Sequence, residues 1–117
     1  MSFFTLAALV SGLSFLGFGW ACQTSAYMKQ EFIRYGYDRQ RALTGYLQMA
    51  GGLGVLLGCF YSPLLGLAAA TGLCLMMAYG FGVRIYIRDT LLQATPAFLY
   101  AALNLYLAWA FAARLPQ

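Results

Sequence analysis

Four apolar blocks, each long enough to cross a bilayer, constrain this chain more than any other feature of its sequence. They span about residues 3–22, 42–60, 64–83 and 91–113, and a membrane-spanning helix needs roughly 20 apolar residues. Of the 117 residues, 62% are hydrophobic and only 9% are charged, which is more apolar surface than a soluble domain of this size can bury. The sequence therefore predicts a single all-α domain over residues 1–117, an integral membrane four-helix bundle.

The connection between the first two blocks has a helical pattern of its own. Met28, Phe32 and Tyr35 recur at the spacing of one helix face, and Gly36 can end a helix there. The pattern favours a short interfacial helix between helices 1 and 2. A solvated basic loop is the alternative.

Basic residues gather at one end of the predicted topology. Six of the seven Lys and Arg residues fall in segments 23–41 and 84–90, whereas Arg114 lies at the other end. By the positive-inside rule these two segments are cytoplasmic, and both termini lie on the opposite side. This topology accounts for the formal charge of +4 without nucleic acid as a partner. We expect a multi-pass protein of the bacterial inner (plasma) membrane, whose partner is the lipid bilayer.

Small residues recur at helical spacing in the second and third blocks, and such residues let membrane helices approach closely. Gly54 and Gly58 form a GxxxG pair, and the third block has a small residue at every fourth position. We expect these faces to form helix-packing contacts, either inside the bundle or with another protein. The residues concerned are Gly51, Gly54, Gly58, Gly66, Ala70 and Ala78.

Polar side chains inside the apolar blocks need hydrogen-bond partners, because hydrocarbon supplies none. The residues concerned are Gln48, Gln93, Tyr100 and Asn104. We expect them to face the bundle interior. There they would either link helices or form a polar pocket for a quinone head group or a lipid.

The sequence shows no catalytic or metal-binding constellation. It has no histidine, which is the commonest metal ligand and general base. The carboxylates Glu31, Asp38 and Asp89 all lie in polar connections, where each is expected to cap a helix or pair with a nearby Arg. The three cysteines form no CxxC motif and are expected to be structural. We therefore expect a protein that is not an enzyme and has no metal site.

One series of motifs runs through nearly the whole chain. It comprises Phe32, Tyr35 and Gly36, then GYLQMAGGLGVLLG from Gly45, then Pro63, Leu64, Gly66, Leu67 and Ala68, and finally Arg88, Asp89, Pro96 and Ala97. In this order the motifs resemble those of the DoxX-like family of small four-helix membrane proteins. The glycine-rich second helix is the most telling part of the resemblance.

The resemblance implies a four-helix bundle that is often a partner of membrane oxidoreductases. One branch of the family includes the small subunit of a thiosulfate:quinone oxidoreductase, and other members are proposed to assist the assembly of membrane proteins. This chain departs from the family pattern at three places. Many relatives have Glu where Gln48 stands, a basic residue where Cys22 and Gln23 stand, and a His near Arg84.

These departures remove the positions at which the family would most readily move protons. We therefore expect a non-catalytic accessory or structural subunit that packs on a larger respiratory or photosynthetic membrane complex. No cofactor is expected beyond a bound quinone or lipid. The alternative is a quinone-associated membrane redox protein or an assembly chaperone for membrane proteins.

Overall fold

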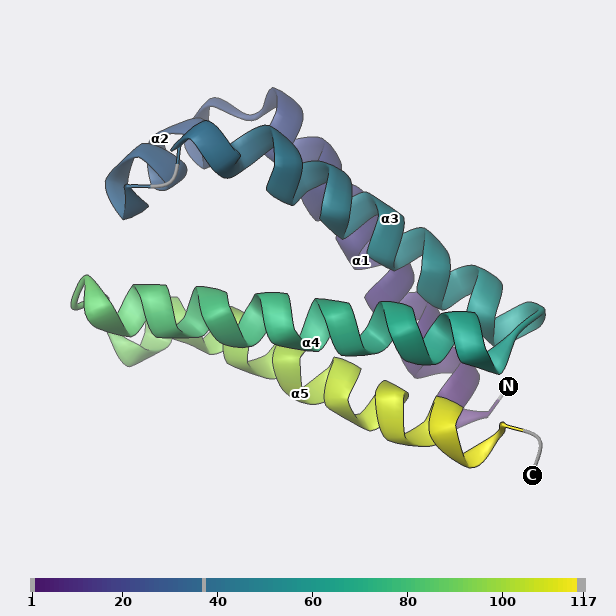
Figure 1. Ribbon diagram of the computed structural model, residues 1–117. Helices are drawn as coiled ribbons and strands as arrows, with labels where there is room; N and C mark the ends of the chain where they lie inside the picture. The colour runs from purple at the N-terminus through teal and green to yellow at the C-terminus, as the bar shows by residue number, and fades with distance from the viewer. Residues whose placement is uncertain (1, 37, 116–117) are drawn as a thin grey trace.

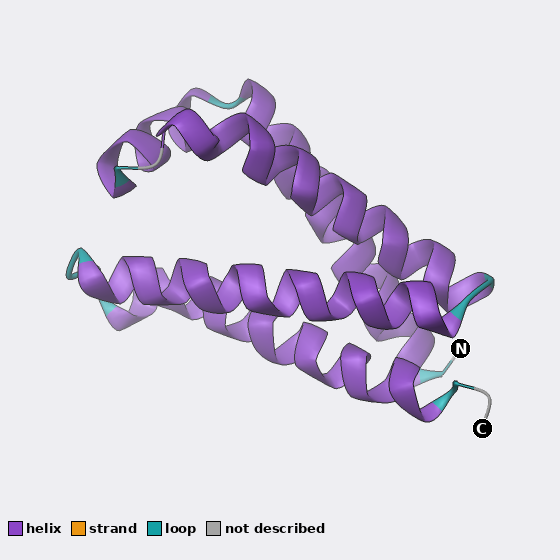
Figure 2. Ribbon diagram, viewed as in Figure 1, coloured by secondary structure: helices purple, strands orange, loops and turns teal. Residues whose placement is uncertain are grey.

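The computed structural model describes residues 2–36 and 38–115, and within these ranges every regular element is a helix (Figures 1 and 2). The elements in chain order are α1 (Phe3–Thr24), α2 (Ala26–Tyr35), η1 (Asp38–Gln40), α3 (Arg41–Phe60), α4 (Pro63–Tyr86) and α5 (Leu91–Ala113). The helices α1, α3, α4 and α5 are each long and apolar enough to cross a membrane. The predicted four-helix architecture, with a short helix between the first two long ones, is confirmed.

Local sequence explains where the helices begin and end. The residues Ser2, Ser25, Ser62 and Thr90 are N-caps, and each side chain accepts a hydrogen bond from a backbone N–H in the first turn. Gly36 ends α2 in the left-handed conformation, with φ of 84°, which glycine adopts without steric penalty. The helices α1 and α4 continue past their expected ends at 22 and 83 to Thr24 and Tyr86. Helical hydrogen bonding thus extends beyond the apolar runs.

Glycines hold α1 and α3 together as a tight pair. Gly12 of α1 faces Gly52 of α3, and Gly19 faces Gly45, so the same contact recurs after about two helical turns. A Cβ on Gly52 would lie 2.6 Å from the carbonyl oxygen of Gly12. The two backbones approach this closely because neither side of the contact has a side chain.

The helices α4 and α5 form the second pair, and α3 joins the two pairs. Gly58 of α3 lies against the backbone of Gly66 near the start of α4, and Gly54 lies against Ala69. On its other side, Gly66 lies against the ring of Phe111 on α5. Close backbone packing therefore brings three helices together at the end of the molecule that holds the 61–62 connection.

The two pairs separate toward the opposite end. Figure 1 shows α2 and the turn between α4 and α5 facing each other there, while both chain termini lie at the joined end. The joined half has a packed apolar core, with Phe15, Val55, Leu73, Leu107 and Phe111 almost completely buried. The bundle is therefore closed along only part of its length, which the apolar pattern alone did not indicate.

The basic segments 23–41 and 84–90 lie at the separated end, as the four-crossing topology required. Arg114 lies at the joined end with the termini. The assignment of the separated end to the cytoplasm, and of the protein to a bacterial inner membrane, stays a prediction.

The contact between Gly58 and Gly66 generates a first testable prediction. Gly58→Ala should destabilise the protein by about 1–3 kcal/mol, because the added Cβ overlaps the α4 backbone and forces α3 and α4 apart. Unfolding of the purified protein in mixed micelles, followed by circular dichroism, measures this change.

Gly72→Ala is the matched control, because a Cβ added there meets nothing within 4 Å. This control should unfold like the unmodified protein or at slightly higher denaturant concentration, since Ala favours helix over Gly. Equal stability of the two variants would show that the Gly58 contact is not tight.

Candidate functional site: a cleft between the helix pairs

A cleft of about 470 Å³ lies between the two helix pairs, toward the end where they separate. All five α-helices contribute to its lining, which is mostly apolar. Its larger apolar residues include Phe18, Met28, Phe32, Met76, Met77 and Val83. Sites for small molecules commonly enclose about 300–1,000 Å³ and combine an apolar lining with a few polar groups. The cleft has the size and character of such a site.

The polar groups of the lining come from several helices. They are Gln40, Thr44, Gln48, Tyr79, Arg84 and Tyr100. Tyr100 of α5 donates its hydroxyl hydrogen bond to Ser14 Oγ on α1 at 3.1 Å, and its ring packs edge-on against Phe15 and Phe18. These contacts fix Tyr100 in place and join α5 to α1 beside the cleft.

Gln48 is the buried polar group whose hydrogen bonding is incomplete. Gln48 belongs to α3, is only 6% exposed and lines the cleft. Its Oε1 accepts a weak hydrogen bond from the Cys22 thiol at 3.9 Å. Its amide N–H groups have no acceptor among the residues that the structure describes. No fully enclosed side-chain N or O atom in the described ranges lacks a hydrogen-bond partner, so the Gln48 amide nitrogen is open to the cleft, where it can donate to an acceptor on a bound molecule.

The four residues expected to form one polar pocket occupy three different places. Gln48 and Tyr100 line the cleft, whereas Asn104 lies deeper, fully buried between α5 and α1. Asn104 Oδ1 accepts a hydrogen bond from Ser11 Oγ at 2.8 Å, and its Nδ2 donates to the Tyr100 carbonyl at 2.9 Å. Asn104 therefore links helices and is not part of the cleft.

Gln93 lies outside the cleft for a local reason. Gln93 is exposed in the first turn of α5. Its Oε1 accepts a hydrogen bond from the backbone N–H of Thr90 at 3.0 Å. In return, the backbone N–H of Gln93 donates a hydrogen bond to Thr90 Oγ1. This reciprocal arrangement is a capping box. Because Gln93 stands three residues after the N-cap, it serves the helix end and does not face the interior.

The small residues expected at helix-packing or partner interfaces mostly serve contacts within the chain. Gly51 lies against Leu73, Gly54 and Gly58 lie against α4, Gly66 lies against α5, and Ala70 is fully buried. Ala78 is exposed on α4. The short 61–62 connection places α4 directly beside α3, so the GxxxG pair is taken up by the next helix of the same chain.

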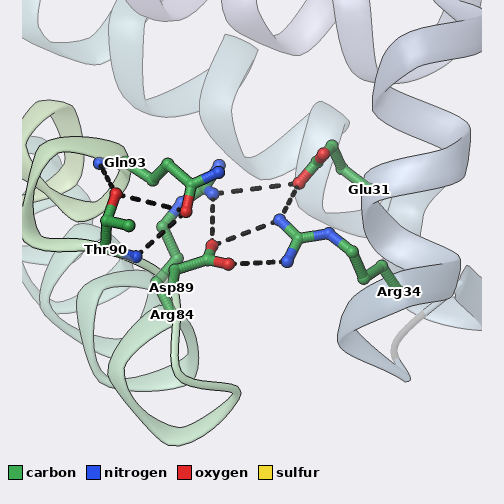
Figure 3. A network of polar contacts seen from close by, with 6 residues as sticks. All are labelled: Glu31, Arg34, Arg84, Asp89, Thr90 and Gln93. Carbon is green, nitrogen blue, oxygen red and sulfur yellow. Dashed lines mark hydrogen bonds and ion pairs between the residues drawn. The ribbon is translucent and has the colours of Figure 1, made fainter.

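An ion-pair cluster joins the two helix pairs where they separate (Figure 3). Arg34 of α2 makes a bidentate contact with Asp89 in the α4–α5 turn, with nitrogen–oxygen distances of 2.6 and 3.2 Å. Arg34 also contacts Glu31 at 2.5 Å. Arg84 of α4 contacts Asp89 at 2.9 Å and Glu31 at 3.8 Å. We name Glu31, Arg34, Arg84 and Asp89 the four-charge cluster.

The turn geometry explains how Asp89 reaches its partners. Arg88 adopts a left-handed conformation with φ of 65°, which costs a non-glycine residue about 1–2 kcal/mol. The turn lets the Asp89 backbone N–H donate to the Arg84 carbonyl at 2.9 Å. The Asp89 side chain, only 5% exposed, then lies between the two guanidinium groups. The ion pairs offset the backbone strain.

Hydrogen bonding within the cluster shifts the titration of its members. The Arg34 guanidinium beside Asp89 holds the pKa of that carboxyl below its ordinary value, and Arg84 adds to this effect. The same hydrogen bond, with that to Glu31, raises the pKa of Arg34. Both groups are therefore charged throughout the neutral range.

Sequence reasoning predicted partners for Glu31 and Asp89 but not this cluster. The spacing of Glu31 and Arg34 on one helix turn is visible in the sequence, whereas Asp89 lies 55 residues from Arg34. The side chain of Asp38 lies outside the described part of the structure. The apolar lining of the cleft was also missed, because Met28, Met76 and Met77 have no sequence signal that distinguishes a lining from a packed core.

The cysteines and carboxylates do not gather in one place. Cys22 is buried, Cys59 and Cys74 are half-buried, and all are free thiols. Within residues 2–36 and 38–115, no three His, Cys, Asp or Glu side chains lie close enough together to hold a metal ion. The cleft can contact a bound molecule through its hydrogen-bonding and apolar side chains.

The family model described as the DoxX-like family matches residues 4–111. The chain belongs to the DoxX-like family. The match includes the cleft, the four-charge cluster and nearly the full length of the long helices of this DoxX-like protein. Comparisons with curated proteins and with solved structures find no match. The resemblance inferred from the motifs is thus confirmed, and a multi-pass integral membrane protein follows from the family and the apolar helices.

The depressed pKa of Asp89 generates a second prediction, which concerns pH. A carboxyl with a folded-state pKa below its unfolded value of about 3.9 stabilises the fold fully above that value, and the contribution is lost as the pH falls through the folded pKa. The separation of α2 from the α4–α5 turn should therefore stay constant between about pH 5 and 8. It should increase only in strong acid.

Spin labels at the exposed positions Gln30 and Leu92 report this separation by double electron–electron resonance in nanodiscs. Asp89→Asn, which removes the charge at similar size, should lengthen or broaden the distance distribution at every pH. A transition centred near pH 6 would contradict the assignment.

Proposed function

We propose that this DoxX-like protein is a non-catalytic membrane protein that binds a bilayer-dissolved molecule bearing a hydrogen-bond acceptor, such as a quinone, in the cleft. The observation that carries the proposal is the buried Gln48 amide, which lines an apolar cleft and has no acceptor among the described residues. A ligand carbonyl would satisfy it. Because the amide nitrogen is open to the cleft, it can donate to such an acceptor without any change in the helices.

A quinone fits the chemistry of this lining. Its carbonyl oxygens bear no charge, which suits a molecule dissolved in the bilayer, and they can accept hydrogen bonds from an amide donor. Its flat ring suits the aromatic and thioether side chains of Phe18, Met76 and Met77. Gln48 neither takes up nor releases a proton near neutral pH, which favours binding over proton-coupled redox chemistry by this chain.

Gln48→Leu tests the proposal. It should weaken binding of a fluorescent or isotope-labelled short-chain quinone about tenfold, because a hydrogen bond to a buried group contributes about 1–1.5 kcal/mol. Titration of the protein in nanodiscs with the labelled quinone measures the dissociation constant. The matched control is Gln30→Leu, the same substitution at an exposed position of α2 outside the cleft.

Unchanged quinone affinity in Gln48→Leu would show that the Gln48 amide does not donate the proposed hydrogen bond to the quinone. Equal weakening in both variants would assign the effect to general destabilisation. Circular dichroism of each variant checks that the helices are intact.

A second candidate function, an accessory subunit on a larger membrane complex, is favoured by the outward face of α4. The exposed residues Ala68, Gly72, Leu75, Ala78 and Gly82 lie on one side of this helix at 100° per residue. A Cβ added at Gly72 or Gly82 meets nothing within 4 Å. Within the described ranges no other helix covers Gly72 or Gly82, so a neighbouring membrane helix can approach α4 closely at these two positions, beside the exposed Leu75.

Replacing Gly72 and Gly82 with Leu should then detach the protein from its complex while leaving its own fold intact. Co-purification in mild detergent, with quantitative mass spectrometry, measures the loss of partners. Gly17→Leu is the control, because Gly17 is also exposed and open but lies on α1. Full retention of every partner by the double variant would count against this candidate.

A further inference from the structure

We propose that the cleft is entered from the bilayer, between α3 and α4, and that the four-charge cluster closes its aqueous end. This inference rests on the proposed function for its biological use, but it concerns access to the cleft and is tested without a ligand. It restricts the occupant to molecules that dissolve in the membrane.

Exposed lining residues locate the entrance. Leu43 of α3 and Tyr79 of α4 both line the cleft and are 58% and 62% exposed. Both lie in helices long and apolar enough to span the membrane. An opening bounded by such residues faces lipid, because the outer surfaces of these helices are surrounded by the bilayer.

The opposite side of the cleft is more restricted. There Phe18 of α1 and Tyr100 of α5 pack edge-on, with ring centroids 5.1 Å apart, and the Tyr100 hydroxyl bonds to Ser14. This aromatic contact bridges α1 and α5 beside the cleft. On the α3–α4 side the close glycine contacts run from Gly51 to Gly58, in the joined half, and the exposed lining residues Leu43 and Tyr79 lie beyond them toward the separated end.

The aqueous end is covered by the cluster and by α2. Met28 and Phe32 of α2 line the cleft, and so does Arg84, which belongs to the cluster. Figure 3 shows Arg34 reaching from α2 toward Asp89 in the α4–α5 turn, with Glu31 and Arg84 completing the connection. The two Arg and two carboxylate side chains balance in charge, and every pair joins groups that are at most 40% exposed.

This arrangement joins the two helix pairs by polar contacts at the end where they separate. The Arg34–Asp89 contact is bidentate and runs between α2 and the α4–α5 turn, and such pairs hold a defined geometry. Although the exposed Gln40 also lines the cleft at this end, we expect the intact cluster to limit the access of water and charged solutes to Gln48. The unpaired Gln48 amide is then available to an acceptor arriving through lipid.

The test places one nitroxide at Thr44→Cys, which lines the cleft, in a chain whose native cysteines are replaced by Ala. In nanodiscs, collisions with oxygen report contact with lipid, and collisions with a polar nickel chelate report contact with water. Because nanodiscs expose both membrane faces, the orientation of the protein does not affect the result. We expect frequent oxygen collisions and rare nickel collisions at position 44.

Breaking the four-charge cluster should change the frequency of nickel collisions at position 44 and leave that of oxygen collisions unchanged. The double variant Arg34→Gln and Asp89→Asn should raise nickel collisions at least severalfold, toward those of a label at the exposed Gln30. Asp89→Asn alone, the milder change, should raise them in the same direction. Lys29→Gln is the matched control, since it removes a charge from the exposed face of α2 outside the cluster.

Three outcomes would overturn the proposal. Nickel collisions at position 44 that already equal those at Gln30 would show that the aqueous end is open. Unchanged nickel collisions in the folded cluster variants would show that the cluster does not close it. Oxygen collisions as rare as those of a label at the fully buried Leu107 would exclude entry from lipid. Failure of quinone to bind would leave all three measurements unaffected.

Discussion

Backbone contact at α3 organises the whole molecule. Gly45 and Gly52 admit α1 on one side of this helix, while Gly54 and Gly58 admit α4 on another. Lipid offers no hydrophobic drive for helices to associate, so close van der Waals packing and interhelical hydrogen bonds must hold the bundle together. A helix with small residues on two faces can form both contacts at once. The other helices are arranged around it.

The cleft follows from the position of these contacts. The glycine contacts between the helix pairs lie in one half of the molecule, and the four-charge cluster connects the pairs in the other half. Ion pairs between partly covered groups keep two elements in register without filling the space between them. The cleft is therefore compatible with a folded bundle, and a bundle packed evenly along its length would have no comparable space.

Gln48 and Asn104 are both buried amides, but their hydrogen bonding differs. A buried amide in a membrane helix normally finds a partner on a neighbouring helix, as Asn104 does with Ser11. Gln48 has only a weak contact with the Cys22 thiol at 3.9 Å. The fold tolerates this because the Gln48 amide nitrogen is open to the cleft and is not enclosed among apolar side chains.

The sequence by itself predicted the membrane class, the number and order of the long helices, and the short α2 with its end at Gly36, because apolar length and local capping chemistry depend only on neighbouring residues. It also identified Gln48 and the glycine faces as points of contact. It did not determine which helix each face meets, that Gln93 caps α5, or that Arg34 meets Asp89 across 55 residues. Only the tertiary structure decided these contacts. It also decided the position of the cleft, because the angle between the two helix pairs depends on where their backbones touch in space.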